Sequence, residues 1–157
     1  RDIKLYNMID IYKKDIKIEN RNRQIGLWIK DWCKEEFNRD WDYCLTLNYK
    51  FPKLKEVVCR NNLNKYIKKL RESDSKVEGF IVNELDTNLI SLHHHLVVKS
   101  DLNERQLQQL TNRVWNNIGG NFIDKYDSNR EVNWCVYMTK HLEKTKRNSW
   151  DIISNFK

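Results

Sequence analysis

The sequence predicts an α+β fold, in which an antiparallel sheet is flanked by helices and followed by one more helix near the C-terminus. Segments of alternating apolar and polar residues, typical of strands, are separated by segments whose apolar residues recur every three or four positions, as in helices. The chain has 157 residues, 39% of them hydrophobic, and this size suits one ordinary core. With only 4 Gly and 1 Pro, few flexible joints are expected.

Residues 1–40 are expected to form a helical extension that packs on the main domain. Between Leu5 and Phe37 charged residues are mixed with apolar ones at helical spacing, including Ile25, Trp28, Ile29 and Trp32. The main domain is then expected to span residues 41–157.

The main domain begins with a predicted strand and a predicted amphipathic helix. The segment WDYCLTLNYKF, residues 41–51, alternates β-branched, aromatic and aliphatic side chains, and Pro52 ends it. Beyond Pro52 the apolar residues Leu63, Tyr66, Ile67 and Leu70 lie on one helical face. The other positions carry basic residues, namely Arg60, Lys65, Lys68, Lys69 and Arg71.

A hairpin, a second helix and a short strand are expected next. GFIVNEL (79–85) and LHHHLVV (92–98) have the composition of two strands joined by a polar connection. Asp101 with Glu104 is a helix-start pattern, and Gly119 with Gly120 is a helix-end pattern.

A short strand is expected from Asn121, followed by a last helix at about 131–146. From Trp41 to Tyr126 the order is therefore β-α-β-β-α-β, the split βαβ order of a ferredoxin-like sheet. This fold serves many functions, so the chemistry has to come from particular side chains.

Three adjacent histidines point to a metal site. On a strand His93 and His95 face the same way, about 7 Å apart, while His94 faces the other side. Glu84, near the end of the preceding strand, is expected to lie across the hairpin and to add a carboxylate. This donor set suits Mg²⁺ or Mn²⁺ and would also hold zinc. The alternative is a strand whose histidines are only hydrogen-bonded or partly exposed.

The last helix carries a candidate nucleophile. Tyr137, Lys140, His141 and Lys144 stand at i, i+3, i+4 and i+7 and share one helical face. A phenol beside cations is suited to attack a phosphodiester, because positive charge favours the phenolate and holds the phosphate. The alternative is an amphipathic helix whose tyrosine only borders the core.

The formal charge of +7 favours an anionic partner, and nucleic acid is the first candidate. Phosphate contacts are expected from basic residues, namely Lys68, Lys69, Lys144, Lys146 and Arg147. Base stacking is expected from aromatic residues such as Tyr43, Tyr49 and Trp134, unless these belong to the core.

Several classes of site and location are excluded or disfavoured. The four cysteines form no C-x-x-C pair, so buried free thiols are expected. No phosphate-binding loop of the G-x-x-x-x-G-K-[ST] type occurs, so strand separation would need a separate helicase. No apolar run approaches the roughly 18 residues of a membrane span, so no membrane partner is expected. The expected location is the bacterial cytoplasm, or the host nucleus for a eukaryotic virus.

Taken together, three motifs resemble those of the HUH endonucleases, the rolling-circle replication initiator (Rep) proteins of plasmids, phages and small single-stranded DNA viruses. LTL (45–47), LHHHLVV and YMTK (137–140) occur in the order of that family, and the likeness covers about residues 41–146. His94 stands where the family has a bulky apolar residue. His141 stands where two-tyrosine initiators have their second tyrosine, so the chain resembles the single-tyrosine type.

The resemblance implies metal-dependent, sequence-specific nicking and joining of single-stranded DNA at an origin or origin hairpin. Tyr137 would form a 5′-phosphotyrosine and release a 3′-OH that primes a host polymerase. Glu84, His93 and His95 would hold the ion, and Lys140 would neutralise phosphate charge or orient water at the ion. The alternatives are a relaxase or single-tyrosine transposase of the same superfamily, or a non-catalytic module that binds single-stranded DNA.

Overall fold

A computed structural model describes residues 20–51, 54–85, 92–142 and 149–154, and in these ranges it contains a five-stranded antiparallel sheet with helices on both faces. The strands are β1 (Tyr43–Leu47), β2 (Glu78–Leu85), β3 (Leu92–Lys99), β4 (Asn121–Lys125) and β5 (Ser149–Ile153). The helices are α2 (Asn20–Phe37), α3 (Glu56–Ser73), α4 (Glu104–Trp115) and α5 (Trp134–Met138). The predicted α+β class is confirmed.

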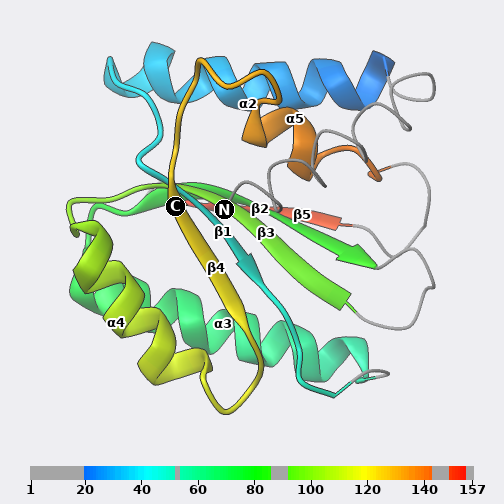
Figure 1. Cartoon of the computed structure of the whole chain (residues 1–157), viewed down its shortest axis with the longest axis vertical. Coiled ribbons are helices and arrows are strands. Elements are labelled where there is room, and N and C mark those ends of the chain that lie inside the picture. The colour runs from blue at the N-terminus through cyan, green and yellow to red at the C-terminus, as the bar shows by residue number, and fades with distance from the viewer. Residues whose placement is uncertain (1–19, 52–53, 86–91, 143–148, 155–157) are drawn as a thin grey trace.

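The sheet has the strand order β4-β1-β3-β2-β5. Its first four members follow the chain order β1-α3-β2-β3-α4-β4, which is the predicted split βαβ arrangement. Helices α3 and α4 cover one face, and α2 and α5 cover the other (Figure 1). The β2–β3 hairpin is confirmed, with all eight residues of each strand paired in antiparallel register.

The face beneath α3 and α4 holds the larger core. Alternate residues of β1 and β3, such as Leu45 and Leu96, meet buried side chains of the two helices. These helix residues include Leu63, Tyr66, Leu70, Leu107, Leu110 and Trp115. Fully burying each such side chain contributes about 1.5–3 kcal/mol, so this layer fixes the helices on the sheet.

The opposite face is covered by α2 and α5, which pack tightly on each other. A Cβ atom at Gly26 would lie 2.7 Å from Val136 Cα and 2.8 Å from the Cys135 carbonyl oxygen, so only glycine permits this approach. The Thr139 hydroxyl donates to the Asn22 carbonyl at 3.0 Å. The described part of the N-terminal extension, residues 20–40, is thus anchored to the helix that carries Tyr137.

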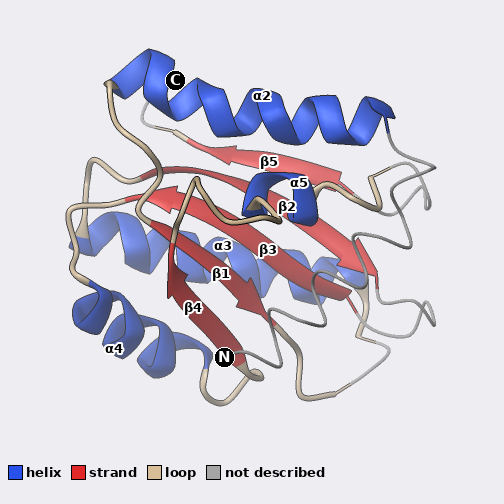
Figure 2. Ribbon diagram, turned by 45° about the horizontal axis from the view of Figure 1, so that its top comes forward, coloured by secondary structure: helices blue, strands red, loops and turns tan. Residues whose placement is uncertain are grey.

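Some element ends differ from the sequence expectations. The last helix is much shorter than the predicted 131–146, because α5 ends at Met138. The Thr139 hydroxyl lies within hydrogen-bond distance of the Cys135 and Val136 carbonyl oxygens of the preceding turn. Residues 149–153 form β5, a strand that the sequence did not predict, and they pair with the edge of β2 that β3 leaves free (Figure 2).

The ends of α4 also differ from the prediction. Asn103, rather than Asp101, caps the helix, in a reciprocal capping box with Gln106. The helix ends at Trp115, and neither Gly119 nor Gly120 has a positive φ. Gly119 is required for space, since a Cβ there would meet the backbone of Asn48.

Two exclusions made from the sequence concern the cysteines and the membrane. Cys33, Cys44, Cys59 and Cys135 are buried free thiols, as predicted. Within the described ranges, no helix combines the length and apolar character that crossing a bilayer requires.

Candidate metal centre

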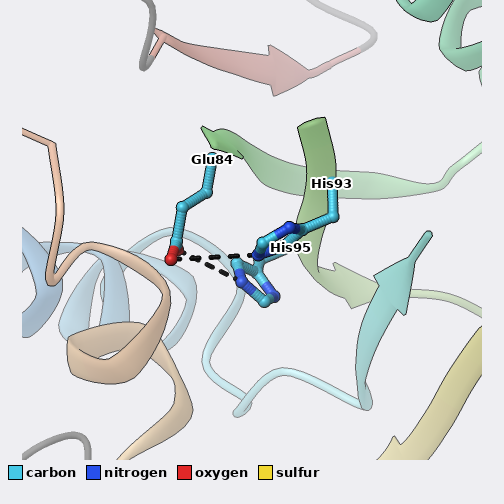
Figure 3. A group of neighbouring side chains, drawn as sticks. All are labelled: Glu84, His93 and His95. Atoms are coloured by element: carbon cyan, nitrogen blue, oxygen red, sulfur yellow. Dashed lines mark ion pairs between the residues drawn. The ribbon is translucent and has the colours of Figure 1, made fainter. Parts of the chain in front are cut away.

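Glu84, His93 and His95 meet on the sheet face that α2 and α5 cover. Glu84 of β2 pairs directly with His93 of β3, and His95 lies two residues further along the same strand face. The Glu84 carboxylate lies 3.8 Å from His93 Nε2 and 3.2 Å from His95 Nε2 (Figure 3). One potential ligand atom from each residue lies within 4.8 Å of the other two, so this group could bind a divalent metal ion.

His95 has the environment of a metal-binding imidazole. It is buried, and burial lowers its pKa, so the ring is neutral. Its Nδ1 lies 3.0 Å from Thr46 Oγ1, while its Nε2 has no hydrogen-bond partner among the described residues. With an ion bound, a proton on Nδ1 donated to Thr46 would leave the Nε2 lone pair for the ion, the usual arrangement at ligating histidines.

Thr46 also belongs to this site, although the sequence analysis named it only as part of the LTL motif and gave it no role. It is the middle residue of LTL, and the β1–β3 register sets it directly opposite His95. Its hydroxyl fixes the orientation of that ring. The cross-strand register is the signal that assigns this role, and a single sequence does not contain it.

The Glu84 carboxylate is buried and surrounded by nitrogen groups. Lys140 Nζ lies 3.2 Å from both of its oxygens, and His141 Nε2 lies 3.6 Å from one of them. Burial acts to raise the pKa of Glu84, but contact with His95 and the positive charge of Lys140 outweigh it and hold this pKa far below its ordinary value. Glu84 is therefore an ionised carboxylate, as a metal ligand must be.

Tyr137 and Lys140 adjoin the same group. The Tyr137 ring packs against the His95 ring with centroids 5.4 Å apart, and Lys140 Nζ lies 3.7 Å from the Tyr137 ring centroid. Lys140 is only 4% exposed. Tyr137, Lys140 and His141 all lie at the carboxylate–imidazole cluster, but the predicted continuous helical face is wrong, since only Tyr137 is in α5 and the other two lie in the turn that follows it.

The sequence predicted that neighbouring cations favour the phenolate of Tyr137, which would lower its pKa, and this prediction is wrong. Burial, together with the negative charge of Glu84, raises the pKa of Tyr137 to about 12. Lys140 is paired with Glu84, so its charge is already balanced and does not favour the phenolate. Tyr137 is a neutral phenol at pH 7.

His94 lies on the opposite face of β3, as strand alternation predicts. Its Nδ1 lies 2.5 Å from Asn83 Oδ1, and its Nε2 lies 2.6 Å from the Tyr49 hydroxyl. The side chain is 1% exposed, and burial lowers its pKa to about 3. His94 is thus a neutral, hydrogen-bonded core residue on the face of β3 opposite to the one that carries His93 and His95.

Of the basic residues expected to contact DNA, the two that the structure describes lie away from this cluster. Lys68 and Lys69 are exposed on α3, on the far face of the sheet, and Lys69 pairs with Glu72 at 3.2 Å. The remaining basic candidates, Lys144, Lys146 and Arg147, lie outside the described residues.

The aromatic residues expected to stack on bases are structural instead. Tyr43 and Trp134 are buried, and each donates a hydrogen bond to a backbone carbonyl. Tyr49 is half-buried and donates to the Cys59 carbonyl. Their rings fill the space between sheet and helices, so the stacking prediction is wrong for these three residues.

Comparison of the chain with protein-family models, curated proteins and solved structures gave no match.

Proposed function

We propose that this protein is a metal-dependent endonuclease and strand transferase of the HUH type, which nicks and joins single-stranded DNA at a replication origin. The observation that carries the proposal is the meeting of Glu84, His93 and His95 with the phenol of Tyr137 from α5 and the ammonium of Lys140 from the turn that follows it. The order of the three motifs, which resembles that of single-tyrosine initiators, gives further support.

The donor set fits a divalent ion, because His95 presents an unpaired ring nitrogen beside an ionised carboxylate. Glu84, His93 and His95 would hold Mg²⁺ or Mn²⁺, which supplies Lewis-acid stabilisation of phosphate charge when bound. Thr46 would keep the His95 ring in its ligating orientation.

The residues of the chain would carry out a transesterification. The Tyr137 oxygen forms a bond to phosphorus, the bond from phosphorus to the 3′-oxygen breaks, and the proton lost by the phenol balances the proton gained by the 3′-oxygen. The products are a 5′-phosphotyrosine and a free 3′-OH, and reversal joins the ends. The 3′-OH would prime a host polymerase, with a separate helicase opening the duplex.

One observation favours a second candidate, a module that binds single-stranded DNA without cutting it. Lys140 already occupies both oxygens of the Glu84 carboxylate, and the pKa of Tyr137 is raised. A protein that never binds a metal would keep this ion pair permanently. Relaxases and single-tyrosine transposases would use the same chemistry on other substrates.

The test is a covalent adduct on a denaturing gel after incubation with Mn²⁺ and single-stranded origin-like oligonucleotides. We expect the wild type to give a DNA-shifted band, and Tyr137→Phe to bind DNA without forming it. Tyr126→Phe is the matched control, because Tyr126 is also a partly buried tyrosine of this core. His93→Ala and His95→Ala should lose the band, whereas His94→Ala should keep it. DNA binding without any adduct in the wild type would favour the non-catalytic module.

A further inference from the structure

Two tryptophans on the metal-centre side of the sheet are half-exposed. Trp28 of α2 is 50% exposed and Trp150 of β5 is 49% exposed. By contrast, Trp41, Trp115 and Trp134 are buried. Large aromatic rings are costly to leave in water, and an exposed group of them often marks a contact surface.

The sheet register places Trp150 level with the candidate metal centre. Trp150 pairs with Val82 of β2, and Val82 pairs with His95 of β3. Residues that are directly paired point to the same face, so Trp150 and His95 share the face covered by α2 and α5. They are separated by two strand spacings, about 10 Å.

A buried phenylalanine holds the two indole rings in place. Phe80 stacks on Trp150 with centroids 6.2 Å apart and an interplanar angle of 20°. Trp28 meets the same Phe80 ring edge-on at 5.7 Å. Because Phe80 is buried, both tryptophans rest on a fixed support, and α2 runs along this edge of the sheet above β5 (Figure 2).

Positive charge accompanies the rings. Arg21 lies seven residues before Trp28, so it occupies the same stripe of α2 about 10 Å away. The first turn of α2 has no acidic residue, and its start is tied to the metal centre through Asn22, whose side chain donates to the Lys140 carbonyl. A cation on the same helix stripe as Trp28 is suited to contact a phosphate backbone.

We propose that Trp28 and Trp150 form a stacking platform for the bases of a single-stranded nucleic acid whose backbone reaches the metal centre. The proposal rests on the proposed function, and it assigns the bases that flank the reacting phosphate to the α2–β5 edge. Indole rings stack on every base, so the platform supports binding without reading sequence. A single strand fits because its bases are free to stack, whereas those of a duplex are already stacked on one another.

The experiment measures fluorescence anisotropy of a labelled mixed-sequence oligonucleotide with the full chain in EDTA, where binding is separated from cleavage. We expect Trp28→Ala and Trp150→Ala each to weaken binding of the single strand about tenfold or more. Trp150→Phe, which keeps an aromatic face, should retain most of the affinity. Ile152→Ala is the matched control, since Ile152 is 48% exposed on the same strand but cannot stack, and its affinity should stay unchanged.

Unchanged affinity in both tryptophan-to-alanine variants would overturn the platform, as would a wild type that does not bind single strands. An equal loss of affinity for a blunt duplex would also overturn it, because a duplex offers no free base faces. Recovery in Trp150→Phe separates stacking from misfolding. A wild type that binds in a Trp150-dependent way but forms no adduct would leave the platform standing and refute only the nuclease.

Discussion

Replacing Lys140 with methionine removes the cation that balances Glu84 while keeping a side chain of similar length. Lys140 Nζ lies 3.2 Å from both carboxylate oxygens, and each residue is 4% exposed. A divalent ion held at this site would share the carboxylate with this ammonium. The substitution therefore acts in opposite directions on the stability of the fold and on the affinity for metal.

The structure sets the magnitude of the effect. Unit charges about 3.2 Å apart attract by roughly 5 kcal/mol at an effective dielectric constant near 20, and the cost of burying both charges offsets part of this. Leaving Glu84 without its main partner costs about 3–5 kcal/mol of unfolding free energy. At about 2–4 °C per kcal/mol for a chain of this size, Tm should fall by roughly 6–20 °C.

The assay is thermal unfolding with and without Mn²⁺, together with calorimetric titration of Mn²⁺. We expect saturating Mn²⁺ to restore much of the lost stability of Lys140→Met, because the ion replaces the missing charge. The affinity for Mn²⁺ should rise about tenfold or more, since no ammonium competes for Glu84.

Lys69→Met provides a matched control, because Lys69 forms an exposed ion pair with Glu72. That pair is worth less than about 1 kcal/mol, so this variant should keep its Tm and its Mn²⁺ affinity. If Lys140→Met also kept both values, the Lys140–Glu84 pair would not govern the site and the reasoning would fail.

Three further predictions concern Thr46, His94 and Tyr137. Thr46→Val removes the hydroxyl that orients His95 and should weaken Mn²⁺ binding about 10–100-fold by calorimetry, while Thr46→Ser should not; equal affinities would refute the orienting role. Burial lowers the pKa of His94 to about 3 from its ordinary 6.5, so between these two pH values the side chain is protonated in the unfolded chain and neutral in the folded one. Stability should therefore fall as pH drops from 6.5 toward 3, by up to about 1.4 kcal/mol per pH unit, and urea midpoints of His94→Gln should show a shallower fall. Because the pKa of Tyr137 is raised to about 12, the rate of adduct formation should keep increasing with pH toward that value, and a flat profile would show that proton loss does not limit the reaction.

Strand alternation predicted much of the site. It separated His93 and His95 from His94, and the hairpin pattern placed Glu84 opposite the ligands, as the β2–β3 register shows. The strand inferences succeeded because they depend only on local geometry. The helical spacing named Tyr137 and Lys140 as neighbours, but Lys140 lies in the turn beyond the end of α5 and not on a continuous helical face.

The remaining features depend on contacts between distant segments. Thr46 meets His95 only through the β1–β3 register, and β5 forms only because β2 offers a free edge. The raised pKa of Tyr137 follows from its burial and from the negative charge of Glu84, which comes from a distant strand. The exposure of Trp28 and Trp150 depends on how α2 and β5 pack on the rest of the sheet. None of these relations is encoded in local spacing.

The close approach at Gly26 decides where the chain can be shortened. The β-α-β-β-α-β order begins at β1, so a fragment that starts at Trp41 contains every element of that order. However, α5 packs against α2 at Gly26, and the Asn22 carbonyl accepts a hydrogen bond from Thr139, the residue before Lys140. Such a fragment would keep its sheet but lose the support of the tyrosine-bearing turn. Helices α2 and α5 therefore act as one packing unit, and a shortened chain has to keep both or lose both.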